Sequence, residues 1–111
     1  MTLPFIQLLA FIFLLDNPGA HVTPLKPTLH IVRIDGMRFV PKVIEIQAGD
    51  KVRWVNESDS FHNVETDDGI MKSKMLDKGE SYEQVFSKSG EIKYYCKPHK
   101  IMGMKGVVRV K

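Results

Sequence analysis

Apolar and polar residues alternate in short runs from about residue 28 to the end of the chain. Val52 and Trp54 alternate with Arg53 and Val55 in residues 51–56, and Ile44 and Ile46 share one face of their segment. This period of two is typical of a half-buried strand. The predicted strands cover residues 28–34, 42–47, 51–56, 61–66, 81–86, 91–96 and 106–111. Such spacing favours an all-β sandwich or barrel of about seven to eight strands.

One long interval breaks this pattern. Residues 67–80 are polar and contain glycine, which predicts a long loop with one helical turn around residues 71–75. Shorter turns are indicated at residues 49–50 and 89–90, where glycine stands beside a polar residue.

The N-terminal segment has a different character. Residues 3–15 are almost purely apolar, and small residues follow at positions 19 and 20. This layout predicts a cleaved signal peptide over residues 1–20 and a single mature domain over residues 21–111. No Lys or Arg precedes the apolar run, and Pro18 lies three positions before the cleavage point. An uncleaved anchor therefore stays open as an alternative.

The composition is that of one folded domain: 111 residues, 43% hydrophobic and 26% charged. The net charge of +3, or +4 without residues 1–20, is mild and dispersed, so it does not call for nucleic acid as a partner. The lone Cys96 excludes an intramolecular disulfide and a thiolate-only zinc or iron–sulfur site. Because a single thiol in an exported protein needs protection or a task, metal ligation becomes the leading explanation.

Four residues carry the candidate chemistry. Cys96, His99 and Met104 lie within nine residues of one another, and His62 lies 34 residues before the cysteine. A histidine near a loop–strand junction and a loop that begins at a strand end could together surround one ion. Two imidazoles, one thiolate and a weak thioether form the donor set of a blue-copper centre. Calcium and magnesium prefer oxygen ligands instead.

Residues 49–56 and the segment Phe61-His62-Asn63-Val64 resemble the first-ligand region of the small blue copper proteins, the cupredoxins. Residues 95–104 resemble their ligand loop, especially in proteins of the pseudoazurin and plastocyanin type. The resemblance covers about residues 36–111. It implies a Greek-key β-sandwich with one type 1 copper per chain, whose ligands would be His62, Cys96, His99 and Met104. It also implies that Asn63 ties the two ligand-bearing segments together by hydrogen bonds.

Two features depart from the pattern. Phe61 stands where many relatives have proline, and two methionines compete for the axial position. Amicyanin-like loops would select Met102, three residues after His99. Met104 instead leads directly into the last predicted strand, as the methionine does in the longer loops of the family. This register favours Met104 over Met102.

The resemblance implies a one-electron carrier rather than an enzyme. The copper of this carrier would cycle between Cu(I) and Cu(II). Lys97, Lys100 and Lys105 surround the apolar part of the ligand loop, so we expect a redox partner with an acidic docking face, such as a cytochrome or a copper enzyme. We also expect a monomer in the periplasm or another exported location, with no membrane span after the signal is removed.

Three other interpretations of the same residues stay open. A copper-handling protein, either a chaperone or a resistance factor, would add the soft ligands Met37, Met71, Met75 and Met102. A copper enzyme would chelate the ion through an N-terminal His21, helped by His30. A structural sandwich without metal would require the four candidate ligands to coincide by chance.

Overall fold

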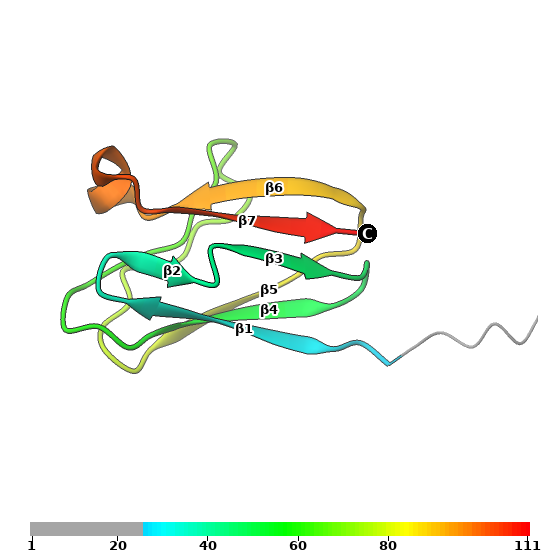
Figure 1. Ribbon diagram of the computed structural model, residues 1–111, viewed down its shortest axis with the longest axis horizontal. Coiled ribbons are helices and arrows are strands. Elements are labelled where there is room, and N and C mark those ends of the chain that lie inside the picture. Colours follow the sequence, from blue (N-terminus) through cyan, green and yellow to red (C-terminus); the bar gives the residue numbers. More distant parts are fainter. Residues whose placement is uncertain (1–25) are drawn as a thin grey trace, which may run out of the picture.

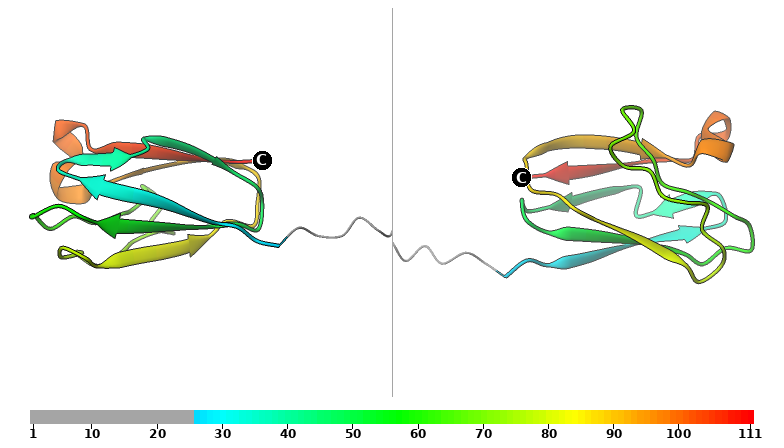
Figure 2. Two further views of the ribbon diagram at one scale, coloured as in Figure 1. Left: turned by 60° about the horizontal axis from the view of Figure 1, so that its bottom comes forward. Right: turned by 180° about the vertical axis from the view of Figure 1, so that it is seen from behind.

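The computed structural model describes residues 26–111. In this part of the chain seven strands form two sheets that face each other (Figures 1 and 2). The strands are β1 (Leu29–Asp35), β2 (Arg38–Val40), β3 (Val43–Ile46), β4 (Lys51–Asn56), β5 (Ser81–Val85), β6 (Gly90–Tyr95) and β7 (Lys105–Val110). A short 3-10 helix, η2 (Lys97–Met102), joins the last two. The predicted all-β fold is confirmed.

The strand order explains how distant segments meet. One sheet has the order β2-β1-β4-β5, and the other has the order β3-β7-β6. The strands β1 and β4 run parallel, as do β3 and β7, so the chain must cross between the sheets rather than form only hairpins. The turn between β1 and β2, the long segment after β4 and η2 therefore gather at one end of the sandwich (Figure 1).

The core lies between the two sheets and follows the predicted alternation. Val52 and Trp54 on β4 are fully buried, while Lys51, Arg53 and Val55 are half-buried. Trp54 packs against the Tyr94 ring from the opposite sheet at a centroid distance of 5.2 Å. The edge-to-face arrangement of these aromatic rings joins the two layers.

Two predictions about local structure are wrong. Residues 61–66 form isolated bridges, because His62 pairs with Leu76 while Glu65 pairs with both Lys72 and Tyr95. A segment that changes partners every few residues cannot continue as a ladder. Residues 71–75 contain no helical turn, and Met71 is buried in the core instead. The sequence analysis also missed β2, whose three residues are too few for alternation to reveal.

Gly106 is the position where a small side-chain change should matter most to the fold. It lies opposite Tyr94 in the β6–β7 ladder, and an added Cβ would overlap the Cζ and Oη atoms of that buried ring. We therefore expect Gly106→Ala to lower the free energy of unfolding by about 1–3 kcal/mol through overpacking. Chemical denaturation followed by tryptophan fluorescence measures this change.

Lys93→Ala, on the exposed face of the neighbouring strand, is the control and should stay within about 0.5 kcal/mol of the wild type. Equal stability of Gly106→Ala and the wild type would contradict the tight packing of Gly106 against Tyr94.

Candidate metal centre

Three of the four predicted ligands meet at the end of the sandwich that carries η2. His62 comes from the segment after β4, Cys96 follows β6 directly, and His99 lies within η2. The sulfur Sγ of Cys96 lies 3.6 Å from Nδ1 of His62 and 3.4 Å from Nδ1 of His99. All three ligand atoms lie within 4.8 Å of one another. One ion could therefore bind to all three after only a small adjustment.

The surroundings prepare His62 to bind a metal through Nδ1. Its imidazole is fully buried, and the Ser60 hydroxyl lies 3.0 Å from the other ring nitrogen, Nε2. A partner on the outer nitrogen orients the ring and leaves the inner nitrogen to the metal. Burial lowers the pKa of His62, and the nearby His99 lowers it further. The neutral form, which is the one that ligates a metal, is thereby favoured.

Cys96 lies in a buried position beside the two imidazoles. Burial raises the pKa of its thiol, although the Asn63 amide, whose N–H donates to Sγ over 3.5 Å, acts in the opposite direction. A soft metal ion would have to displace this proton, so metal binding should release a proton to the solvent.

The shape of η2 returns the chain to the centre. Pro98 lies in the first turn of the helix, and Gly103 caps its end in the left-handed region at a φ of 85°. The amide of Met104 then donates to the His99 carbonyl over 3.3 Å, and its carbonyl accepts from the Cys96 amide over 3.1 Å. The backbone of Met104 is therefore held directly beside that of Cys96.

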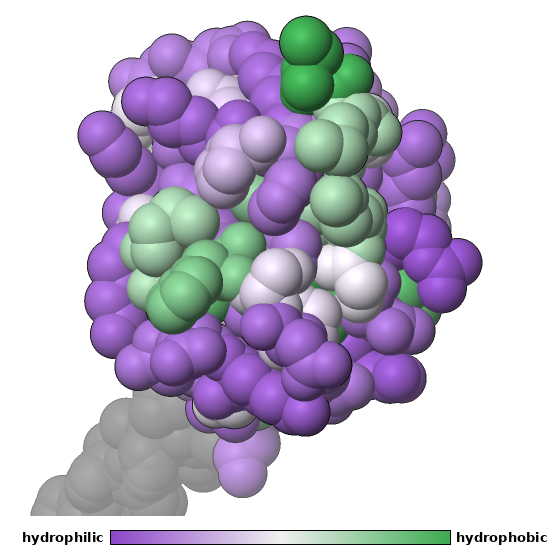
Figure 3. Space-filling view, turned by 90° about the vertical axis from the view of Figure 1, so that its left-hand side faces the viewer, coloured by the Kyte–Doolittle hydropathy of each residue, from purple (hydrophilic) through white to green (hydrophobic). Residues whose placement is uncertain are grey.

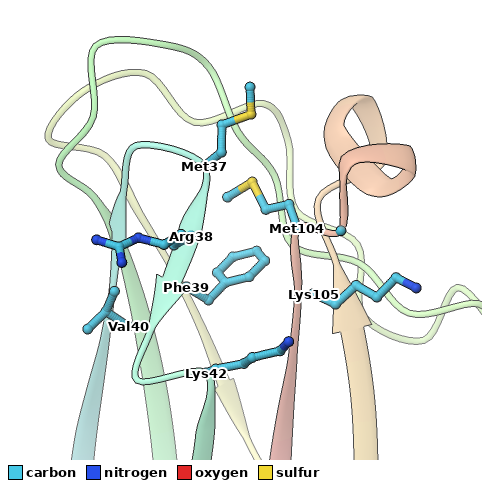
Figure 4. A pocket seen from close by; sticks show the side chains of 8 residues that line it. Met37, Arg38, Phe39, Val40, Lys42, Met104 and Lys105 are labelled. Atoms are coloured by element: carbon cyan, nitrogen blue, oxygen red, sulfur yellow. The ribbon is translucent and has the colours of Figure 1, made fainter.

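The two candidate axial methionines have very different environments. Met104 is 1% exposed, whereas Met102 is 63% exposed at the end of η2. Met104 also lines an open cavity of about 340 Å³ with Met37 and Phe39, where the thioether lies above the Phe39 ring (Figure 4). Burial beside the Cys96 backbone supports the register that favours Met104.

Asn63 ties the two ligand-bearing segments together, as predicted. Its Oδ1 accepts from the Lys97 amide over 2.7 Å, and its Nδ2 donates to the carboxylate of Glu65 over 2.8 Å. The sequence analysis did not identify Glu65 as part of this network. Glu65 is only 7% exposed, and its backbone pairs with Tyr95 in both directions. The buried carboxylate therefore helps to fix the orientation of Asn63.

The donor set fits copper better than the other common metals. Thiolate and thioether sulfur are soft ligands, and imidazole suits both oxidation states of copper. The three converging donors come from two segments that the sandwich holds in place: His62 lies after β4, and Cys96 and His99 lie between β6 and β7. The chemistry of the side chains and their separations therefore fit a copper ion.

The family of copper-binding proteins described as plastocyanin/azurin matches residues 28–111. The chain belongs to this family. It is 32% identical to amicyanin of Paracoccus versutus over 83 residues, which cover 70% of this chain and 63% of that protein. It is 34% identical to plastocyanin of Scenedesmus fuscus over 83 residues, which cover 65% of this chain and 85% of that protein. The amicyanin match thus spans less than two thirds of amicyanin's own length.

Solved structures of the family agree with the fold. An oxidised amicyanin variant superposes with a TM-score of 0.70 at 28% identity, covering 75% of this chain and 82% of that one. A purple cupredoxin from Nitrosopumilus maritimus gives a TM-score of 0.68 at 28% identity, covering 74% and 99%. The predictions of a cupredoxin fold and of copper as the cofactor are confirmed.

Several predictions concern the N-terminal residues. The signal peptide over residues 1–20 and the N-terminal His21 lie outside the described residues. Within residues 26–111, no helix is long and apolar enough to cross a membrane. His30, the second histidine of the enzyme alternative, contacts the Asp50 carboxylate through Nε2 at 2.9 Å.

Proposed function

We propose that this protein is a one-electron carrier whose type 1 copper is bound by His62, Cys96, His99 and Met104. The observation that carries the proposal is the convergence of two imidazole nitrogens and the only thiol within 4.8 Å, at a largely buried position. Bound copper would supply one electron by changing between Cu(I) and Cu(II).

The arrangement favours electron transfer over catalysis. Three strong donors and a buried thioether leave no convenient position for a substrate, which Lewis-acid or hydrolytic chemistry requires. Ser60 orients the His62 ring, and Asn63 joins the His62 segment to the start of η2. These contacts limit the movement of the ligands between oxidation states.

His99 offers the electron a route to the surface. It is half-buried, unlike His62 and Cys96, and Ile101 and Met102 beside it are 92% and 63% exposed. Figure 3 shows apolar patches among polar side chains on this end of the molecule. A small apolar area around a half-buried ligand suits brief contact with a redox partner. We further propose an exported, monomeric protein that exchanges electrons with such a partner.

A copper-handling function has weaker support. Of the additional methionines it would use, Met71 is buried in the core and Met75 lies in the segment before β5. Met37 does line the cavity beside Met104, but Phe39 and charged side chains form much of its wall.

Redox cycling of the purified protein distinguishes the two functions. After addition of one equivalent of Cu(II), we expect an intense thiolate-to-copper band in the red that ascorbate removes and hexacyanoferrate(III) restores. Visible absorption and a metal assay measure the band and the stoichiometry. A protein that binds Cu(I) but forms no stable Cu(II) state would contradict the carrier function and favour copper handling.

A further inference from the structure

Charge is segregated along the outer face of the β3-β7-β6 sheet. At the end away from the metal centre, Arg109 on β7 lies opposite Glu45 on β3 and Glu91 on β6. Arg109 forms an ion pair with Glu91 at 3.2 Å, and Lys111 forms one with Glu45 at 3.4 Å. Positive and negative groups therefore balance at this end.

The opposite end of the same face has no such balance. Lys105 on β7 lies opposite Tyr95, and Lys93 on β6 lies opposite Val107. Lys42 joins them, since its carbonyl accepts from the Val107 amide over 2.9 Å. Within residues 26–111, no carboxylate lies at ion-pair distance from Lys42, Lys93 or Lys105. We call these three lysines, with Tyr95 and Val107 between them, the basic face.

The basic face surrounds a hollow. An open pocket of about 290 Å³ is lined by all three lysines and by Tyr95, Lys100 and Asp67. Among residues 26–111, Asp67 is the only carboxylate in its wall, and it forms an ion pair with Lys100 at 3.2 Å. Lys100 also lies over the Tyr95 ring, 4.1 Å from its centroid. Because Asp67 balances the charge of Lys100, the net positive charge of the hollow comes from the other three lysines.

The basic face lies close to the metal centre along the chain. Tyr95 directly precedes Cys96, and Lys105 directly follows Met104. Lys42 and Lys105 also line the cavity that contains Met104, and Figure 4 shows Lys42 extending toward β7. A molecule bound here would contact the two strand ends that carry these proposed ligands.

We propose that the basic face is a docking surface for an acidic protein, with a carboxylate side chain of the partner entering the hollow. The inference rests on the electron-carrier function proposed above. It differs from docking around His99 because Lys93 lies on the outer face of β6 and Lys42 directly precedes β3, so neither belongs to the ligand loop. Lysine supplies charge without a fixed geometry, which suits brief association steered by electrostatics.

The first test locates the contact. Protein loaded with Cu(I), which is diamagnetic, is titrated with an acidic c-type cytochrome, and amide chemical shifts are followed. We expect the largest shifts at residues 42–43, 93–95 and 105–107. Shifts confined to residues 97–102 would overturn the proposal and leave the His99 end as the docking surface.

The second test measures rates. Lys42→Gln/Lys93→Gln should slow electron transfer to the same cytochrome about tenfold at 0.01 M salt. The difference in rate between this double variant and the wild type should nearly vanish at about 0.5 M salt. The matched control, Lys72→Gln/Lys88→Gln, removes the same charge from exposed positions elsewhere and should change the rate by less than about threefold. Equal slowing by both pairs would show a general charge effect and overturn the proposal.

Two further measurements separate the possible failures. Hexacyanoferrate(III) is a small oxidant, so it tests redox cycling in the absence of a partner protein. Failure of the protein to cycle with this oxidant would contradict the carrier function itself. Binding of mixed-sequence duplex DNA tests whether the basic face recognises a nucleic acid instead of an acidic protein. Tighter binding of DNA than of the cytochrome, lost in Lys42→Gln/Lys93→Gln, would show a nucleic-acid surface and overturn the proposal.

Discussion

Cys96→Ser is expected to remove the intense visible absorption of the copper-loaded protein completely. The band arises from charge transfer between the thiolate and copper, and Cys96 is the only thiol in the sequence. A serine hydroxyl is a harder and much less acidic donor, so it cannot replace the thiolate toward a soft ion. Absorption spectra after addition of Cu(II) measure the effect.

The same variant should keep its fold. Cys96 is fully buried, but serine has nearly the same shape, and its hydroxyl oxygen can accept from the Asn63 amide that now contacts Sγ. We expect a loss of about 1–2 kcal/mol in the free energy of unfolding of the metal-free protein. Far-ultraviolet circular dichroism is the control for folding. An unchanged visible band in a folded Cys96→Ser protein would contradict the proposed copper centre.

Alternation was sufficient to predict most strands because each of them has one face in the core. In β4 the buried positions are Val52, Trp54 and Asn56, with half-buried residues between them. Asn56 shows the limit of the method, because a polar residue at a core position breaks the pattern. Its side-chain Nδ2 donates to the Ser60 and Leu76 carbonyls, while Oδ1 accepts from Ser58. Such a network organises the loop before His62 and cannot be inferred from hydropathy.

The candidate ligands could be identified from their spacing in the sequence. The residues that orient these ligands could not be identified in this way. The local run from Cys96 to Met104 and the upstream His62 were enough to suggest one centre. The sequence around Glu65 gives no sign of burial, because positions 67 and 68 are also acidic and such groups of charges are usually solvated. The bridges of Glu65 with Lys72 and Tyr95 bury it instead. Pairings between distant segments decided this environment.

The lysines show the same limit at the surface. Lys97, Lys100 and Lys105 are neighbours in sequence, but Lys100 is paired with Asp67. Lys42 and Lys93 join Lys105 only because β7 lies between β3 and β6. The distribution of charge on a sheet face therefore follows from strand order, which linear spacing does not contain.

Met104→Leu is expected to preserve copper binding and the visible band but to raise the reduction potential. A thioether donor from Met104 would be weak and would stabilise Cu(II) relative to Cu(I), and leucine would remove this donor. We expect a shift equivalent to at least a tenfold change in the Cu(II)/Cu(I) equilibrium, about 59 mV for a one-electron couple. Because leucine and methionine have similar volumes, the buried position should tolerate the change at a cost below about 1.5 kcal/mol.

Met102→Leu is the matched control for this potential measurement. The two methionines are separated by a single residue, but Met102 is 63% exposed at the end of η2 while Met104 is 1% exposed beside Cys96. Redox titration of both variants, monitored by the visible band, should therefore show a shift for Met104→Leu and none for Met102→Leu. The reverse result would mean that the ligand loop follows the shorter, amicyanin-like register, in which the third residue after His99 completes the centre.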